Sequence, residues 1–199
     1  GSPAFGTPEY MRATQMSGQM ARFYNLPLRS SNACAANYPD SQSAWESAFS
    51  LWACVSSRTN VVYHSAGWLE GGLCASYEKF VMDCETLQQM IHYMQPVTTS
   101  AGDLAFEAIR DVGPTGHFFG TEHTLERYET AFYAPFLSDW SNFENWEERG
   151  SIQTPQRANK IWKQILAEFE PPPTDPSIRE ELQAFVAKRK EEGGAPTDF

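Results

Sequence analysis

The chain has 199 residues, of which 41% are hydrophobic and 20% charged, a composition typical of a globular protein with a buried core. Its 15 Lys and Arg residues against 25 Asp and Glu residues give a net charge of −10, which disfavours a nucleic acid as partner because phosphate binding needs a positive surface. No apolar run approaches the roughly 20 residues that span a bilayer, so we expect no membrane partner.

The N-terminus lacks the basic and then apolar pattern of a signal peptide, which favours a cytoplasmic location. The first residue is not methionine, so we expect the chain either to begin inside a longer protein or to carry a cloning remnant at residues 1–2. The cysteines contain no C-x-x-C pair, and we expect free, buried thiols in a reducing compartment rather than a metal site or disulfides. They are Cys34, Cys54, Cys74 and Cys84.

Pro8 begins a predicted helix over residues 8–24, and a short strand is predicted over 28–32. Asp40 is placed to cap the next helix, whose residues 45, 48, 49, 52 and 55 form an amphipathic face. The β-branched and aromatic residues 60–64 predict a buried strand, and the glycines at 67, 71 and 72 predict a flexible loop. A long helix follows over 77–94, with an apolar stripe from Tyr77 to Met94.

A further helix is predicted from a capping-box-like start at Ser100 to residue 113, with a third strand at 117–119. Aromatic residues are dense over 132–146, and we expect them to pack on a neighbouring subunit. A helix begins at Thr154, three prolines at 171–173 form a stiff spacer, and Asp175 caps a last helix. We expect residues 178, 182, 185 and 186 of this helix to point inward and residues 191–199 to be frayed.

The order strand, helix, strand, helix predicts an α/β fold built from βαβ units with a parallel sheet. A closed (β/α)8 barrel needs about 250 residues, so the alternatives are part of such a barrel and an open α/β sheet. We expect residues 1–130 to form this α/β part, a partial barrel in the first alternative, and residues 131–199 an aromatic-rich helical C-terminal extension.

Ligands of parallel α/β folds bind where strands end, which selects residues 30–40 and 64–72. His64 closes a strand and is either a structural hydrogen-bonding group or a site residue. Glu70 is either a solvated carboxylate or a site acid, while Tyr63 and Trp68 either pack in the core or form a wall for a cation. A second polar cluster holds His117, but its spacing matches no metal motif, and we predict no metal site.

Several segments together resemble the trimethylamine methyltransferase family of corrinoid-dependent enzymes, along essentially the whole chain. They are residues 39–42 (PDSQ), 67–73 (GWLEGGL), 76–79 (SYEK), 113–118 (GPTGHF), 123–125 (HTL) and 157–162 (RANKIW). The resemblance implies the C-terminal part of a TIM (β/α)8 barrel. It also implies methyl transfer from a methylated amine to the reduced cobalt of cobalamin carried by a cognate corrinoid protein. We expect the protein to form a homo-oligomer.

The archaeal trimethylamine enzymes of this family use pyrrolysine, whose position falls near Asn37 and has no equivalent here. The resemblance therefore favours members without pyrrolysine, which act on quaternary amines such as glycine betaine. Catalytic contacts are then assigned to His64, Glu70 and His117. Substrate binding is assigned to Asn32, Asn37, Tyr63 and Trp68. The alternatives are a zinc-dependent corrinoid methyltransferase with another methyl donor, and an inactive half-barrel that serves as a binding or structural module.

Overall fold

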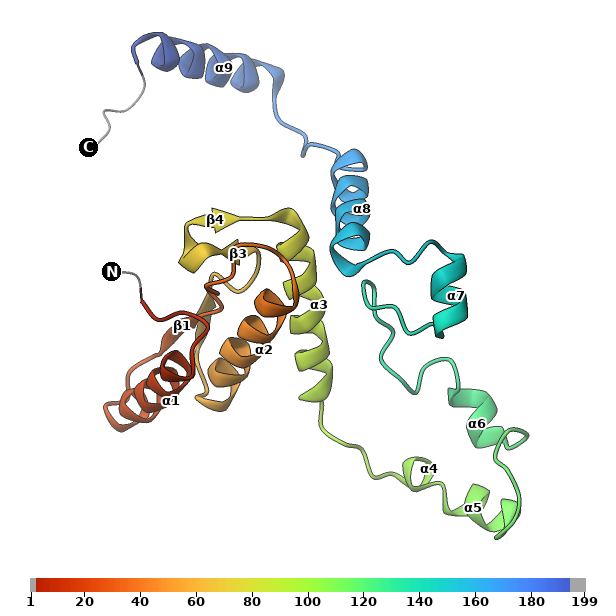
Figure 1. Cartoon of the computed structure of the whole chain (residues 1–199). Helices are drawn as coiled ribbons and strands as arrows, with labels where there is room; N and C mark the ends of the chain where they lie inside the picture. The colour runs from red at the N-terminus through yellow and green to blue at the C-terminus, as the bar shows by residue number, and fades with distance from the viewer. Residues whose placement is uncertain (1–2, 194–199) are drawn as a thin grey trace. The chain divides into compact units, whose positions relative to one another are not determined.

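The computed structural model describes residues 3–193, which form a mixed α/β chain that is mostly helical (Figure 1). The chain divides into two units, one up to Gln164 and one from Ile165 onward. The first unit begins with α1 (Pro8–Phe23), β1 (Arg29–Ser31), α2 (Ser41–Ser56), β2 (Val61–Tyr63), β3 (Trp68–Leu69), a 3-10 turn (Glu70–Gly72), β4 (Cys74–Ala75) and α3 (Tyr77–Tyr93). It continues with α4 (Ala101–Leu104), α5 (Phe106–Val112), α6 (Glu122–Arg127), α7 (Phe143–Glu148) and the start of α8 (Thr154–Ala167), and the second unit carries α9 (Pro176–Glu191).

The β1–α2–β2 segment is a parallel βαβ unit, which confirms the α/β prediction. Arg29 pairs with Val61 and Ser31 with Tyr63, so both strands end at the same edge. Asp40 caps α2 as predicted, because its carboxylate accepts the N–H groups of residues 42 and 43. α1 packs on α2, and Gly18 permits the close approach, since a Cβ there would lie 2.6 Å from the Ser57 carbonyl oxygen.

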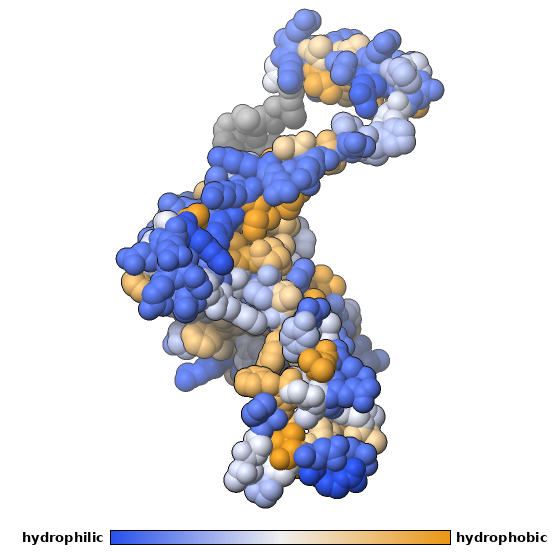
Figure 2. Space-filling view, turned by 90° about the vertical axis from the view of Figure 1, so that its right-hand side faces the viewer, coloured by the Kyte–Doolittle hydropathy of each residue, from blue (hydrophilic) through white to orange (hydrophobic). Residues whose placement is uncertain are grey.

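Several of the predicted burial patterns are wrong. α2 buries a face of small and polar residues that includes Ser43, Ser47 and Cys54, while Trp45 is 52% and Phe49 54% exposed. The strand β2, predicted to be buried, is also largely exposed. The side chains of a strand project from the faces of the sheet, and among residues 3–193 α2 packs on β1 while no helix packs as closely on β2, which is an edge strand. Hydrophobic side chains accordingly reach the surface at several places (Figure 2).

The glycine-rich segment predicted as a loop forms a short hairpin instead, in which β3 pairs antiparallel with β4. Left-handed backbone at Glu70 (φ 51°) and Gly71 (φ 64°) turns the chain between the two strands. The hairpin leads into α3, which is capped by Ser76. α3 buries Lys79 and Asp83, whereas Phe80 of the predicted apolar stripe is 52% exposed.

The predicted helix from Ser100 to 113 is two helices, because Ala105 between α4 and α5 adopts a left-handed conformation with φ 51°. Its capping box at Ser100 is confirmed. The strand predicted at 117–119 is wrong, since this segment forms turns and bends. α6 was not predicted, whereas α7 lies within the extension that was expected to be helical.

Asp175 caps α9 as predicted. Residues 178, 182, 185 and 186, which were expected to point inward, are exposed instead. Of the end predicted to be frayed, residues 194–199 lie outside the described part of the chain. Cys34 and Cys54 are buried free thiols as expected, whereas Cys74 is exposed and Cys84 half-buried.

Candidate functional site

Two candidate site residues follow directly after the paired ends of β1 and β2. Ser31 and Tyr63 are the last paired residues, so Asn32 and His64 leave the sheet side by side at its carboxyl edge. The Asn32 Nδ2 donates a 2.9 Å hydrogen bond to the carbonyl oxygen of Ser65, which joins the two loops. Asn32 is 1% exposed, and its Oδ1 has no hydrogen-bond partner among residues 3–193. The carboxyl edge therefore contains a buried acceptor beside the His64 loop.

Three aromatic rings contact one another in series next to this edge, at tilted or edge-to-face angles. The rings of Tyr63 and His64 lie 4.0 Å apart between centroids, and those of His64 and Trp68 lie 4.7 Å apart at 61°. The guanidinium carbon of Arg29 lies 4.7 Å from the Tyr63 centroid, so one face of that ring already contacts a cation. Aromatic faces attract cations through the ring quadrupole. We call Tyr63, His64 and Trp68 the aromatic cluster; it joins three of the predicted site residues.

The loop after β1 is held against the hairpin by three hydrogen bonds. The N–H of Gly71 donates to the Cys34 carbonyl at 2.7 Å, and the N–H of Glu70 donates to the Ala36 carbonyl at 2.9 Å. The Cys34 thiol donates to the Trp68 carbonyl at 3.1 Å. Cys34, Ala36 and Leu69 form a small buried core here, and burial raises the pKa of the Cys34 thiol. These bonds fix the backbone of Trp68 and Glu70 against the loop after β1.

One buried carboxylate from α2 and one from α3 fix the same loops, and neither was identified from the sequence. One Glu46 carboxylate oxygen accepts the N–H groups of Ala35 (2.7 Å) and Ala36 (3.1 Å). An Asp83 oxygen accepts the N–H of Gly67 at 2.9 Å, and the Asp83 carboxylate also pairs with the fully buried Lys79. The only sequence signal for the second clamp is the i, i+4 spacing of Lys79 and Asp83 on the buried side of α3.

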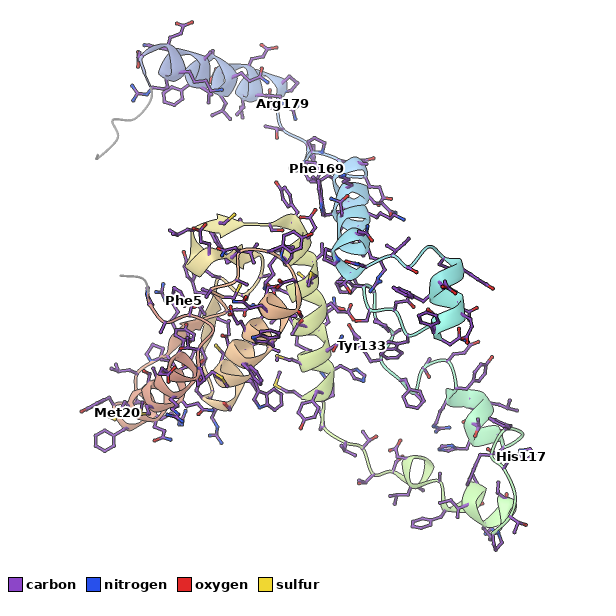
Figure 3. All side chains as sticks on the ribbon, in the orientation of Figure 1. Phe5, Met20, His117, Tyr133, Phe169 and Arg179 are labelled. Carbon is purple, nitrogen blue, oxygen red and sulfur yellow. The ribbon has the colours of Figure 1, made fainter. Side chains whose placement is uncertain are left out.

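The remaining candidates lie at the margin of this arrangement or apart from it. Glu70 is exposed, and no interaction of its side chain is found among residues 3–193. Asn37 is exposed and lines an open hollow of about 670 Å³, together with Glu78 and Asn159. His117 lies between α5 and α6 (Figure 3), and its ring contacts Phe119 at 5.5 Å rather than the aromatic cluster. The structure thus groups Asn32, Tyr63, His64 and Trp68, leaves Glu70 and Asn37 at the margin, and places His117 apart.

The hollow beside Asn37 is bounded by a carboxylate that connects α3 to α8. The Oε1 of Glu78 accepts a 2.6 Å hydrogen bond from Asn159 and a 2.8 Å hydrogen bond from the Trp162 indole. The Ser76 hydroxyl donates to the other oxygen at 3.0 Å. These donors, led by Asn159, lower the pKa of Glu78 to about 2. Glu78 is therefore ionised and fully engaged as a structural group.

Residues 3–193 lack two further features. They contain no group of three or more His, Cys, Asp or Glu side chains placed to hold a metal ion. They also contain no helix with the length and apolarity needed to cross a membrane.

Comparison with known proteins gives the class. Residues 1–194 match the trimethylamine methyltransferase (MTTB) family, and the chain belongs to this family, as its motifs predicted. It is 40% identical to the glycine betaine methyltransferase of Desulfitobacterium hafniense over 195 residues, which cover 98% of this chain and 40% of that protein.

Two other relatives are more distant. A trimethylamine methyltransferase of Methanosarcina mazei is 30% identical over 94% of this chain and 38% of its own length. The L-carnitine:corrinoid methyltransferase of Eubacterium limosum is 29% identical over 85% of this chain and 35% of its own length. The chain thus spans about two fifths of the length of the curated relatives it matches.

Proposed function

We propose that this chain forms part of the donor site of a methyltransferase that moves a methyl group from a quaternary, or tertiary, methylated amine such as glycine betaine to the Co(I) of a corrinoid protein. The observation that carries the proposal is the aromatic cluster beside the buried Asn32, at the carboxyl edge of β1 and β2. This edge is where parallel α/β folds bind ligands. The names of the relatives support a methylated-amine donor and a corrinoid acceptor.

The aromatic cluster suits a quaternary ammonium better than an amine that must be activated. Each cation–π contact with such a group contributes about 0.5–2 kcal/mol, depending on how fully it is desolvated. A quaternary nitrogen leaves as a neutral amine, so no proton has to be delivered to it. Asn37, near the position that pyrrolysine occupies in the archaeal enzymes, carries no group able to activate a tertiary amine. A quaternary donor is therefore our preferred substrate.

The chemistry requires orientation more than acid–base catalysis. Co(I) supplies the electron pair that forms the new carbon–cobalt bond, and the electrons of the broken carbon–nitrogen bond remain on the departing amine. In this proposal Tyr63 and Trp68 hold the ammonium group, and His64 fixes their ring geometry and makes a polar contact to the donor. Asn32 and Asn37 hydrogen-bond to the polar end of the donor. Glu70 balances the positive charge.

The same proposal includes the surroundings of the site. The β1–α2–β2 unit belongs to the C-terminal portion of a (β/α)8 barrel, residues 131–199 form its helical extension, and His117 contributes a substrate contact from the segment between α5 and α6. The protein acts as a homo-oligomer in the cytoplasm with a cognate corrinoid protein that carries the cobalamin. The exposed edge of β2 supports the barrel, since an unpaired strand edge calls for a further strand.

The test replaces the matched two fifths of the Desulfitobacterium hafniense glycine betaine methyltransferase with this chain. The chimera and the chain alone are mixed with cob(I)alamin and either glycine betaine, carnitine or trimethylamine, and methylcob(III)alamin is followed by visible absorption. Methylation from a quaternary donor, abolished or strongly reduced by His64→Ala or Trp68→Ala, is the expected result. A chimera that folds, as judged by circular dichroism, yet methylates from no amine would overturn the proposal. Activity unchanged in the His64 and Glu70 alanine variants would remove their assigned roles.

A further inference from the structure

The helix α9 presents an apolar stripe that no described residue of its own unit, 165–193, covers. The stripe consists of Ile178, Leu182, Phe185 and Val186, which are 48–61% exposed. The helix is well defined locally, since Asp175 caps its N-terminus and proline occupies the first turn. At 16 residues α9 is only just longer than the roughly 12–15 residues below which isolated helices are marginal in water, so packing has to supply much of its stability. Its stability therefore depends on a partner for the stripe.

The spacing of the stripe indicates what kind of partner fits. Ile178, Leu182 and Phe185 follow each other at intervals of four and three, which matches one heptad of a coiled-coil seam. Glu181 and Lys188 lie seven residues apart beside this seam, so they occupy the same flanking position of the heptad with opposite charges. Such a pair complements itself when two copies of the helix run antiparallel.

We propose that α9 pairs antiparallel with α9 of a second copy of this chain. In this arrangement Leu182 of each helix packs against Phe185 of the other. The flanking positions then face each other, so that Glu181 meets Lys188 of the second copy, and the two-fold axis makes this contact twice. A parallel pair would instead place Glu181 opposite Val186 and form no ion pair there. Charge complementarity thus favours a second copy of α9 as the partner and an antiparallel orientation of the two helices.

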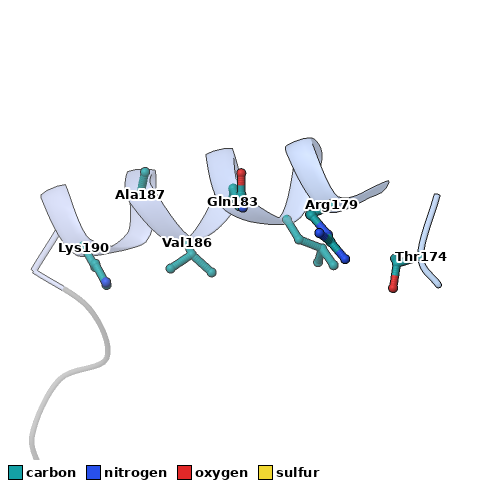
Figure 4. Close-up of a pocket in the computed structure, with 7 residues that line it drawn as sticks. Thr174, Arg179, Gln183, Val186, Ala187 and Lys190 are labelled. Carbon is teal, nitrogen blue, oxygen red and sulfur yellow. The ribbon is translucent and has the colours of Figure 1, made fainter. Parts of the chain in front are cut away.

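The charges already present on α9 are compatible with this pairing. Lys188 lies 3.8 Å from Glu192, an exposed and weak contact, and Glu192 keeps Arg189 as a partner at 2.7 Å when Lys188 turns away. On the opposite flank, Arg179, Val186 and Lys190 border a shallow hollow of about 470 Å³ (Figure 4). Antiparallel pairing brings Lys190 to the N-terminal end of the second helix, near the carboxylate of its Asp175.

The test measures self-association of the full chain by sedimentation equilibrium from low micromolar to near-millimolar concentration. Glu181→Lys sets like charges against each other at both flanking contacts and is expected to weaken dimerisation about tenfold. Lys188→Glu alone has the same effect, and the double charge reversal restores dimerisation. Glu180→Lys is the matched control, because it makes the same charge change on the outer face and leaves the dimer unaffected. Circular dichroism verifies that each variant keeps its helix content.

A direct reading of the contact comes from zero-length carbodiimide coupling of a mixture of isotope-labelled and unlabelled chains. The proposal expects an amide between Lys188 of one copy and Glu181 of the other, seen as a mixed-isotope peptide pair. The same two residues of one helix are about 10 Å apart along its axis and do not couple. A wild-type chain that stays monomeric throughout, or a dimer that Glu181→Lys and Glu180→Lys affect equally, overturns the proposal. So does protection of the stripe in a monomer, which would mean that the chain covers α9 itself.

Discussion

The backbone N–H of Gly67 donates a 2.9 Å hydrogen bond to the carboxylate of Asp83, so the loop after β2 is attached to the buried face of α3. The same carboxylate pairs with Lys79, whose ammonium also donates to the Ser47 hydroxyl at 2.6 Å. Gly67 has φ 88°, and a Cβ there would lie 3.2 Å from the Cβ of Phe80. This clamp holds the backbone between His64 and Trp68 and thereby the spacing of the aromatic cluster.

Asp83→Ala is expected to destabilise the protein by about 3–5 kcal/mol, because it leaves the Lys79 ammonium buried without its counter-charge. It also removes the acceptor of the Gly67 N–H. The measurement is urea unfolding followed by circular dichroism. Lys79→Met combined with Asp83→Leu should cost less than Asp83→Ala, since no buried charge then remains.

The matched control is the exposed pair of Arg110 and Glu107, whose side chains are 69% and 84% exposed. Glu107→Ala should change the free energy of unfolding by less than about 0.5 kcal/mol. Equal losses in the free energy of unfolding for Asp83→Ala and Glu107→Ala would show that the Lys79–Asp83 pair does not hold the loop after β2.

Glu46→Ala is expected to release the loop after β1. The buried Glu46 carboxylate accepts the N–H groups of Ala35 and Ala36, and without it both lose their partner. Hydrogen exchange of these two amides should accelerate, and stability should fall by about 1–3 kcal/mol. Glu46→Gln retains an acceptor oxygen and should show a smaller effect on both measurements. Unchanged exchange at Ala35 and Ala36 in the alanine variant would show that other contacts hold this loop.

The hydrogen bonds to the Glu78 carboxylate lead us to expect a loss of stability in acid. Hydrogen bonds from Asn159, Trp162 and Ser76 lower its pKa from 4.5 to about 2. The ionised form is thus favoured by folding, and its contribution is complete above the unfolded pKa near 4.5 and disappears as the pH falls towards 2. Allowing for solvent screening of this half-buried group, the contribution is about 1–2 kcal/mol. Wild type and Glu78→Gln should differ most above pH 4.5 and converge near pH 2 in urea unfolding; a constant difference would rule out this linkage.

Helix starts were predictable because their signals are local. Asp40, Ser100 and Asp175 each cap a helix through a side chain that reaches the N–H groups two or three residues further on. The strands β1 and β2 were predicted to within one residue at each end (28–32 and 60–64), and their parallel pairing places Asn32 and His64 at one edge.

Burial and the loop clamps were not predictable, because they depend on residues distant in sequence. The Asp83 bond to Gly67 spans 16 residues, and Glu85 accepts the N–H of Leu137 across 52. No local pattern indicates such a contact. The aromatic residues of α2 looked like a core face, but the described part of the chain packs the opposite, serine-rich face instead. The role of His117 remains a prediction, since the structure gives it only the Phe119 contact among residues 3–193.

Thiol reactivity should distinguish the four cysteines. Burial raises the pKa of Cys34 and Cys54, which lowers the fraction of reactive thiolate, whereas Cys74 is exposed on β4. A chromogenic disulfide reagent at pH 8 should therefore modify Cys74 first, and the buried thiols only on unfolding. Cys74→Ser should remove the fast phase, while Cys54→Ser leaves it intact. A fast phase that survives Cys74→Ser would place a second thiol at the surface.

Trp68 provides the most direct test of the aromatic cluster as a cation site, and it requires no cobalamin. Its ring meets His64 edge-on at 4.7 Å. Loss of one cation–π contact of about 0.5–2 kcal/mol corresponds to about 2- to 30-fold weaker binding of a quaternary ammonium. Isothermal titration of the chain with tetramethylammonium and glycine betaine should show this loss for Trp68→Ala and a smaller one for Trp68→Phe, which keeps an aromatic face. Phe23→Ala, at an exposed ring at the end of α1, is the control and should leave binding unchanged. If wild type binds either ligand and Trp68→Ala binds it equally well, the ammonium group is held elsewhere.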